Sequence, residues 1–244
     1  MSRRGFTILE LLVSIGVVAL LLGLLIPMLS GARAAGHRAV CGTNQKQIGL
    51  ACYLYVQDNR ESLPRYDADP SESDWKYGGA IFASGDRPLL DAGRPLNRYV
   101  GATREAGVAD DLGRMFFCPG DGGVFDRSVT AASRGGLSVL EHGTCFREFG
   151  TSYRANGLLL TARPSEDAVR PLRLSEITAS PSRLMLLGDA AWWYATREPG
   201  TPEAMLEASW HRGQDWGNML AVDGSVRFLD FRDALEREYT LRPR

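Results

Sequence analysis

Histidine and cysteine are scarce in this chain, and neither sign of charge is in excess. The 244 residues include 3 histidines and 4 cysteines, and the formal net charge is −1. A nearly neutral chain gives no reason to expect nucleic acid or an anionic surface as a partner. The cysteines form no C-x-x-C pair, which argues against a zinc site on spacing. The apolar fraction of 44% and the charged fraction of 23% are ordinary for a folded protein.

Motifs with a defined catalytic mechanism are also missing. No serine lies in a G-x-S-x-G elbow, and no cysteine or histidine lies in such a motif. Asp189, His211 and Asp215 can be drawn as an acid–base group, but isolated His and Asp residues in loops usually form caps or hydrogen bonds. His37 and His142 are equally isolated, and we expect surface or packing roles for them. We therefore predict that the protein is not an enzyme.

A long apolar run begins a few residues into the chain. Between Phe6 and Leu29 the one charged residue is Glu10. As a helix the run is ~36 Å long at ~1.5 Å per residue, enough for a hydrocarbon core of ~30 Å. Arg3 and Arg4 precede it with no acid nearby, so by the positive-inside tendency this end stays in the cytoplasm. We predict a single-pass membrane protein in which everything after Leu29 lies across the membrane.

A cleaved secretory signal peptide and a plain membrane anchor would also have an apolar run near the N-terminus. Ala32-Arg33-Ala34 resembles an A-x-A cleavage site. The apolar region of an ordinary signal peptide has ~7–15 residues, which is much shorter than this run. Neither a signal peptide nor a plain anchor has a use for Glu10.

Glu10 is therefore the residue that distinguishes a signal peptide, a plain anchor and a membrane helix with a further function. A charged side chain at the centre of a membrane helix costs on the order of 2.5–3.5 kcal/mol, and such residues usually have a partner and a function. No basic residue occurs between Glu10 and Arg33. Cleavage after Gly5 would give Phe6 a positive α-amino group, which could meet Glu10 of a neighbouring helix. Such pairing in a medium of low dielectric favours assembly and sets its register.

The start of the chain resembles the class III signal of type IV prepilins and type II secretion pseudopilins, most clearly in RGFTILELLV at positions 4–13. The resemblance implies that a prepilin peptidase cuts the Gly5–Phe6 bond and methylates the Phe6 amine, and that Glu10 acts in assembly. The implied partners are other copies, related pseudopilins, inner-membrane lipid and the assembly proteins of a secretion machine. The implied location is the inner membrane, with a periplasmic or otherwise extracytoplasmic head. The resemblance does not indicate which filament the protein serves.

A helix is predicted to continue from the membrane segment through residues 30–59. Cys41, Ile48, Cys52 and Tyr55 recur at helical spacing and form one face, which we expect the head to cover. Cys41 and Cys52 lie ~16 Å apart along this axis, too far for a mutual disulfide. Polar side chains lie mostly off this face: Arg38, Gln45, Lys46 and Asp58.

An antiparallel sheet is predicted near the C-terminus. Residues 218–222 and 225–229 flank Asp223-Gly224, which favours a hairpin with a type I′ turn and positive φ at both central residues. Residues 183–187 indicate a buried strand, residues 235–239 indicate a helical turn, and residues 65–115 allow no assignment.

These patterns predict the α+β class, with a long N-terminal helix packed on an antiparallel head. The predicted parts are a leader at 1–5, a transmembrane helix at 6–29, its amphipathic continuation at 30–59 and a pilin-like head at 60–244.

Pieces of the head resemble one branch of pseudopilin-like proteins, whose C-terminal signature is His, nine residues and Asp-Gly within a final hairpin. The matching pieces are CGTNQKQIGL from Cys41, FCPGD from Phe117 and TSYRAN from Thr151. His211 and Asp223-Gly224 match the signature, but eleven residues separate them here. This departure leaves the role of His211 open.

Calcium is a candidate ligand through the same resemblance, because exported pseudopilins of the major type often carry calcium in a C-terminal loop. Calcium takes about six to eight oxygen ligands. The candidate carboxylates are Asp121, Asp126, Asp189, Asp215 and Asp223. No stretch has EF-hand spacing, and aspartate beside glycine commonly makes a turn. We expect no other cofactor.

Export of the head would also permit a disulfide. Cys118 and Cys145 lie in loop-like segments and form the predicted pair, with free buried thiols as the alternative. A bridge between them would contribute ~3 kcal/mol in the chain-entropy model.

The predicted function is that of a structural subunit, a pseudopilin, in a type II secretion-like filament. A type IV pilin for adhesion, motility or DNA uptake is the alternative within the family. Outside it, the alternative is an anchored or secreted enzyme or sugar-binding module with a look-alike leader. Late aromatic residues could line such a module, although aromatic side chains more often fill a core: Trp192, Trp193, Tyr194, Trp210 and Trp216.

Overall fold

The computed structural model divides the chain into two compact units, residues 1–36 and residues 37–244. Helix α1, Ile8–Asp58, contributes to both units. The structure describes residues 8–66, 73–82, 88–90, 93–100, 113–126, 139–160, 171–196, 206–208, 210–211 and 215–243.

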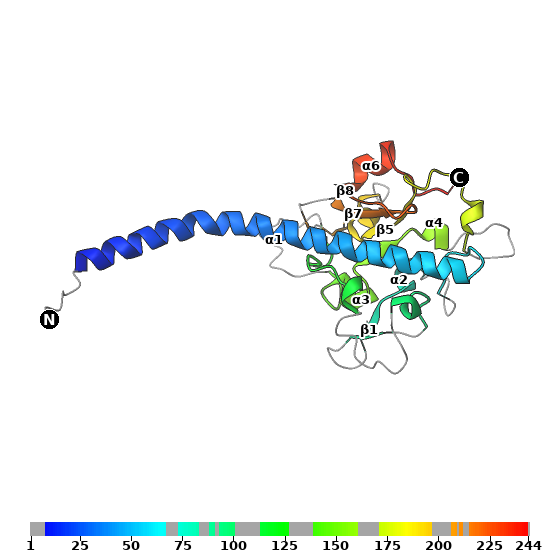
Figure 1. The fold of residues 1–244 in the computed structure, drawn as a ribbon, viewed down its shortest axis with the longest axis horizontal. Helices are drawn as coiled ribbons and strands as arrows, with labels where there is room; N and C mark the ends of the chain where they lie inside the picture. The colour runs from blue at the N-terminus through cyan, green and yellow to red at the C-terminus, as the bar shows by residue number, and fades with distance from the viewer. Residues whose placement is uncertain are drawn as a thin grey trace. The chain divides into compact units, whose positions relative to one another are not determined.

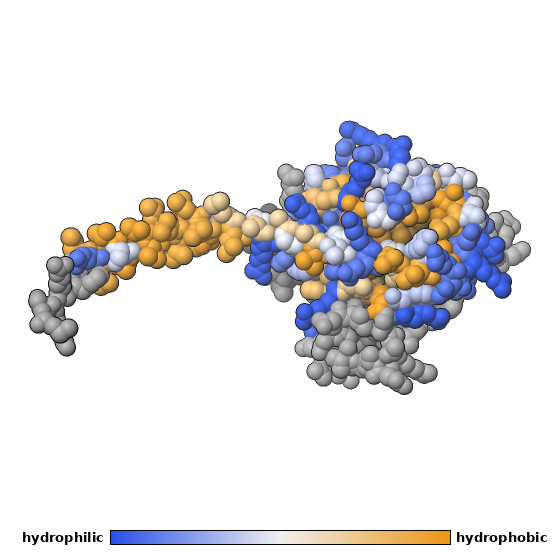
Figure 2. All heavy atoms as spheres, viewed as in Figure 1, coloured by the Kyte–Doolittle hydropathy of each residue, from blue (hydrophilic) through white to orange (hydrophobic). Residues whose placement is uncertain are grey.

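The first unit is the apolar part of α1. The side chains described between Ile8 and Leu29 are all exposed, and Figure 2 shows an almost continuous hydrophobic surface along this segment. A helix that is apolar on every side belongs in a membrane or inside an assembly, because water solvates none of its faces well. Within the described residues, α1 is the one helix long and apolar enough to cross a membrane, a test that a signal sequence also passes.

The second unit consists of the amphipathic part of α1 and the polypeptide that follows it, which we call the head. Cys41, Ile48 and Cys52 are buried and Tyr55 is half-buried, which confirms the predicted face. Gln45 was expected off this face but is 0% exposed. It lies four residues after Cys41, and residues at i and i+4 share one side of a helix.

Backbone geometry ends α1 at Asp58. Arg60 and Glu61 follow with positive φ values of 54° and 64°. The Glu61 N–H donates to the Val56 carbonyl at 2.9 Å, which satisfies one of the carbonyl groups left open at a helix C-terminus. Beyond this end, Ser62 forms an isolated β-bridge with Arg173, and the Leu63 N–H donates to the Leu172 carbonyl at 3.0 Å.

A four-stranded antiparallel sheet in the order β4-β5-β7-β8 confirms the α+β class. Its strands are β4 (Tyr153–Ala155), β5 (Met185–Asp189), β7 (Trp216–Ala221) and β8 (Val226–Asp230). The second half of α1 crosses the sheet (Figure 1). A Cβ atom added at Gly49 would lie 2.9 Å from Leu220 Cδ2, so glycine permits the close approach of α1 to β7.

Successive residues of β7 face two different hydrophobic clusters. Leu220 packs in the cluster that contains the buried residues of α1. Met219 and Ala221 pack in a second cluster, with helices α5 (Ala191–Ala195) and α6 (Phe231–Arg237). This alternation is that of a strand covered on both faces, so the sheet is the central layer of the head.

The turn between β7 and β8 differs from the predicted type I′ turn. The Gly224 N–H donates to the Ala221 carbonyl at 3.0 Å, and the Ala221 N–H donates to the Ser225 carbonyl at 2.9 Å. Gly224 has a φ of 84°, whereas Asp223 does not have a positive φ. The connection is therefore a β-turn that ends in a left-handed glycine, a common three-residue hairpin loop. The Asp223 carboxylate accepts hydrogen bonds from the Ser225 N–H and hydroxyl.

Short elements complete the described part of the head. They are α2 (Ser73–Lys76), β1 (Ala80–Phe82), β2 (Pro88–Leu90), η2 (Asn97–Val100), η3 (Gly113–Phe116), β3 (Phe125–Asp126), α3 (Cys145–Phe149), α4 (Gly157–Leu160), η4 (Leu174–Glu176) and β6 (Leu206–Glu207). β1 pairs with β2, and β3 pairs with β6.

The late aromatic residues mainly fill the head. Trp192 and Tyr194 are buried, whereas Trp193, Trp210 and Trp216 are half-buried. The Trp192 indole N–H donates to the Arg154 carbonyl at 2.9 Å, so the polar atom of this buried ring has a partner, as buried tryptophans usually require.

Candidate functional site

The predicted processing residues Gly5 and Phe6 lie outside the described residues. Glu10 lies in the first turn of α1 with an exposed side chain. A carboxylate in this position interacts favourably with the positive end of the helix dipole. Cleavage before Phe6 would add a positive amine to the same end of the helix.

A disulfide ties α1 to the head, but it is not the predicted one. Cys41 and Cys118 are bonded through their sulfur atoms, with Cα atoms 5.2 Å apart. Cys145, the predicted partner of Cys118, is a free buried cysteine. The helical spacing of Cys41 with Ile48 and Cys52 predicts only that the head covers this face. Only the folded head shows that this helix face meets the segment Phe117–Asp121, the FCPGD loop.

Asp121 fixes the FCPGD loop against the head. The Asp121 carboxylate accepts a hydrogen bond of 2.6 Å from the Ser152 hydroxyl, and Ser152 Oγ accepts one of 3.0 Å from the Cys118 N–H. Burial raises the pKa of Asp121 above its usual value, although the hydrogen bonds oppose this. Three backbone N–H groups also donate to Asp121, at 2.9–3.1 Å: Gly123, Cys145 and Phe146.

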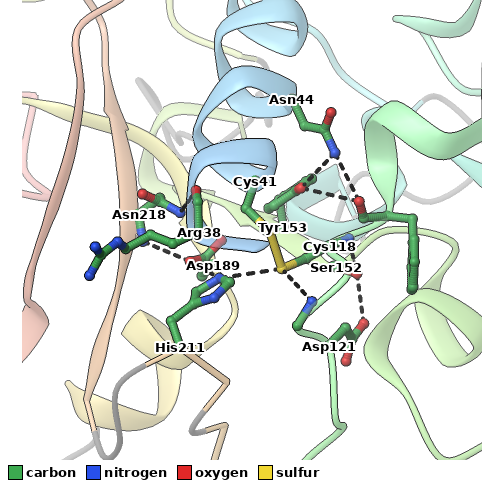
Figure 3. Close-up of a disulfide and its surroundings, with 12 residues drawn as sticks. Arg38, Cys41, Asn44, Cys118, Asp121, Ser152, Tyr153, Asp189, His211 and Asn218 are labelled. Atoms are coloured by element: carbon green, nitrogen blue, oxygen red, sulfur yellow. Dashed lines mark hydrogen bonds and ion pairs between the residues drawn. A yellow bond between two sulfur atoms is a disulfide. The ribbon is translucent and has the colours of Figure 1, made fainter. Parts of the chain in front are cut away.

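His211 lies against the disulfide, as Figure 3 shows. Its Nε2 atom is 3.3 Å from Cys118 Sγ and 3.3 Å from Asp189 Oδ2. The side chains of His211 and Asp189 are each 1% exposed. Asp215, the third member of the predicted acid–base group, instead forms an ion pair with Arg232 at 3.2 Å. The structure therefore joins two of these three residues and places them where solvent has little access.

Amide groups connect Asp189 to α1 and to β7, and Figure 3 shows the contacts of Asn218. The Gln45 amide donates to Asp189 Oδ1 at 2.8 Å and to the Asn218 carbonyl at 3.2 Å. The Asn218 N–H donates to Asp189 Oδ2 at 2.7 Å, and its side-chain amide donates to the Arg38 carbonyl at 3.1 Å. Asp189, Gln45, Asn218 and His211 thus form a polar cluster that links α1, β5 and β7 beside the disulfide.

Sequence reasoning missed Gln45 and Asn218 as members of this cluster. One usable signal is that Gln45 follows Cys41 by four residues and so shares its helix face. Two buried acceptor or donor atoms of the cluster, Gln45 Oε1 and His211 Nδ1, make no hydrogen bond with the part of the chain that the structure describes. Buried polar atoms of this kind usually have a partner, and each exception calls for a physical reason.

The five candidate calcium ligands take part in other interactions. Asp121 and Asp189 accept the hydrogen bonds given above, Asp215 pairs with Arg232, and Asp223 closes its own turn. Asp126 lies in β3. Two groups of three potential metal-ligating side chains occur within the described ranges, and neither includes these aspartates: Cys41 with Cys118 and His211, and Glu141 with His142 and Glu148. Calcium binding stays a prediction.

Comparison with known proteins identifies the start of the chain. Residues 1–26 match the family model of the prokaryotic N-terminal methylation motif. No curated protein and no solved structure matches the chain. The chain therefore carries the leader of type IV pilins and pseudopilins, as the resemblance indicates. With its long apolar helix, this leader indicates a protein anchored in a membrane. The C-terminal His and Asp-Gly signature stays a prediction.

Alkylation of the native full-length chain should leave all four cysteines unlabelled. Burial raises the pKa of Cys52 to about 12, and burial and the Asp121 charge raise the pKa of Cys145 well above its usual value. Because the thiolate is the reactive form, both thiols should label only after denaturation. Cys41 and Cys118 should label only after reduction as well. Peptide mapping should recover a Cys41–Cys118 cross-link, and a Cys118–Cys145 cross-link would contradict the described pairing.

Replacing both Cys41 and Cys118 by alanine should lower the free energy of unfolding by roughly 4.5 kcal/mol. The disulfide spans a sequence separation of 77, and the chain-entropy model assigns about this value to a loop of that length. Guanidinium denaturation of the detergent-solubilised chain measures the change. A reductant should destabilise the wild-type chain by a similar amount and leave the double variant unaffected. Equal stability of variant and wild type would contradict a structural role for the bond.

Proposed function

We propose that this protein is a structural subunit of a type II secretion-like filament. The observation that carries the proposal is the methylation motif matched over residues 1–26, which overlaps the apolar part of α1 from Ile8 to Leu29. Leaders of this kind imply processing by a prepilin peptidase and assembly into a pilin-like filament.

The exposed apolar surface of α1 supports this assembly. Before assembly, lipid surrounds the segment Ile8–Leu29 and keeps it out of water. In a filament, the same segments of neighbouring subunits pack against one another, so the apolar surface stays dry while the heads face the solvent. Moving the segment from lipid into the core of the filament changes its hydrophobic free energy little, because both environments are apolar.

Charge pairing gives this packing its register. The cleaved chain begins with the Phe6 amine, and Glu10 lies four residues further along the sequence. In a helix bundle of low dielectric, the amine of one subunit neutralises the carboxylate of its neighbour. If one helix were shifted by a turn, both charges would be buried without a partner. The free energy of burying an unpaired ion in a protein is unfavourable by roughly several kcal/mol.

The arrangement of the head favours a structural role over a catalytic one. Within the described residues, His211 and Asp189 form the pair that most resembles a catalytic group, and their side chains are each 1% exposed. This burial gives a substrate almost no access to the pair. The hydrogen bonds of this pair hold the helix on the sheet instead.

Two further features support a secretion filament with an extracytoplasmic head. The Cys41–Cys118 disulfide suits an oxidising compartment, and Arg3 and Arg4 favour a cytoplasmic leader. The resemblance of the segment CGTNQKQIGL to one branch of pseudopilin-like proteins favours secretion over a pilus for adhesion, motility or DNA uptake.

Deletion of the gene should therefore reduce protein export and spare twitching and DNA uptake, and the reverse pattern would favour the pilus.

Mature protein isolated from cells should begin at N-methylated Phe6. Intact-mass and N-terminal sequencing measurements report the start of the chain directly. Cells without the prepilin peptidase should accumulate the chain with Met1–Gly5 attached, and Gly5→Leu should have the same effect in normal cells. A start near Ala35 would instead identify a secretory signal peptide and contradict the proposal.

Substituting Glu10→Ala should leave cleavage intact and abolish filament formation, since the neighbouring amine loses its counter-charge. Glu10→Gln should behave alike, because it keeps the shape but not the charge. The matched control is Ser14→Ala, one turn further on, whose hydroxyl only donates to the Leu11 carbonyl at 2.8 Å within the same helix. Shearing and sedimentation of filaments measure assembly, and normal filaments from Glu10→Gln would contradict charge pairing.

A further inference from the structure

The disulfide and His211 form a group with the chemistry of a metal site. One ligating atom from each of Cys41, Cys118 and His211 lies within 4.8 Å of the others, and all three residues are buried. They come from three separate segments: α1, the FCPGD loop and the stretch before β7. Two sulfur atoms and an imidazole nitrogen are the ligands of many tetrahedral zinc sites.

One distance already suits tetrahedral coordination. Zinc bonds of ~2.3 Å to sulfur and ~2.0 Å to nitrogen place a sulfur ~3.5 Å from a nitrogen bound to the same ion. His211 Nε2 lies 3.3 Å from Cys118 Sγ. Asp189 is not a member of this group, but its carboxylate, held in place by hydrogen bonds from Gln45 and Asn218, lies beside the His211 ring as an outer-shell group does in zinc sites.

We propose that Cys41, Cys118 and His211 bind Zn²⁺ when the Cys41–Cys118 disulfide is reduced. A dithiol reductant gives two electrons and two protons to the disulfide and becomes a disulfide itself. The Cys41–Cys118 bond breaks, and each sulfur takes up one proton. Zn²⁺ then displaces both protons as it binds the two thiolates, and the sulfur atoms separate to make room for the ion.

Such a site would hold α1 against the FCPGD loop in both redox states. In the oxidised head a covalent bond ties α1 to the FCPGD loop, and in the reduced head the ion ties the same two residues. The missing C-x-x-C spacing does not count against the site, because its ligands come from segments that meet only in the folded head. The proposal is independent of the filament function, since it concerns the closure of the head alone.

Cobalt provides a spectroscopic test on the full-length chain in detergent. A phosphine reductant, which delivers the same two electrons and binds metal weakly, opens the disulfide. One equivalent of Co²⁺ should then give the visible bands of tetrahedral cobalt and a sulfur-to-cobalt charge-transfer band, and one equivalent of Zn²⁺ should abolish both. The unreduced chain should give neither band. A reduced chain without a sulfur-to-cobalt band would overturn the proposal.

Substitutions assign the ligands. His211→Ala should weaken metal binding at least about tenfold, the smallest effect expected even for an outer-shell partner, and Cys118→Ser should abolish the one-equivalent site. The matched control is His142→Ala, since His142 lies with Glu148 in the other candidate group, where the two pair at 3.0 Å on the surface. The affinity of His142→Ala for Co²⁺ should equal that of the wild type.

Stability measurements keep the test decisive if a variant unfolds. Because a metal that binds only the folded chain raises its stability, Zn²⁺ should raise the melting temperature of the reduced wild-type chain and of His142→Ala. It should not raise that of Cys118→Ser. A sulfur-to-cobalt band that survives in both His211→Ala and the double variant Cys41→Ser/Cys118→Ser would assign binding to the thiols of Cys52 or Cys145 and overturn the proposal.

Discussion

The attachment of α1 to the sheet is the constraint on which the rest of the head depends. One helix has an apolar part that needs lipid or like helices and an amphipathic part that needs the head. The Cys41–Cys118 bond fixes the start of the amphipathic part, and Gly49 lets its middle lie against Leu220. Between these two points Gln45 reaches Asp189, so covalent, packing and polar contacts agree on one position of the helix.

A buried carboxylate at the centre of this attachment is costly unless it is paired and hydrogen-bonded. Asp189 meets this condition through Gln45, the Asn218 backbone and His211. Each partner comes from a different element, so the carboxylate is satisfied only when α1, β7 and the segment before it are all in place. The cluster therefore contributes to the specificity of the fold as well as to its stability.

Local patterns predicted the leader, the long helix, the buried strand β5 and the final hairpin, since each depends on residues close in sequence. The disulfide was predicted wrongly because cysteine connectivity depends on tertiary contacts that spacing does not reveal. Gln45 was misplaced because polar residues are rarely fully buried, and only the approach of Asp189 makes its burial favourable. The turn at Asp223-Gly224 was predicted at the right position but with the wrong type. In the three-residue loop only Gly224 has a positive φ, whereas a type I′ turn requires a positive φ at Asp223 as well.

The position of the disulfide determines how tension travels through a subunit. A pull along the membrane half of α1 enters the head near Cys41, and the sulfur bridge passes it directly to Cys118. The bridge therefore gives such a force a covalent path into the FCPGD loop, in parallel with the contacts that Gln45 and Asn218 make between α1 and the sheet. As long as the bridge stays intact, α1 cannot be pulled away from this loop by breaking hydrogen bonds alone.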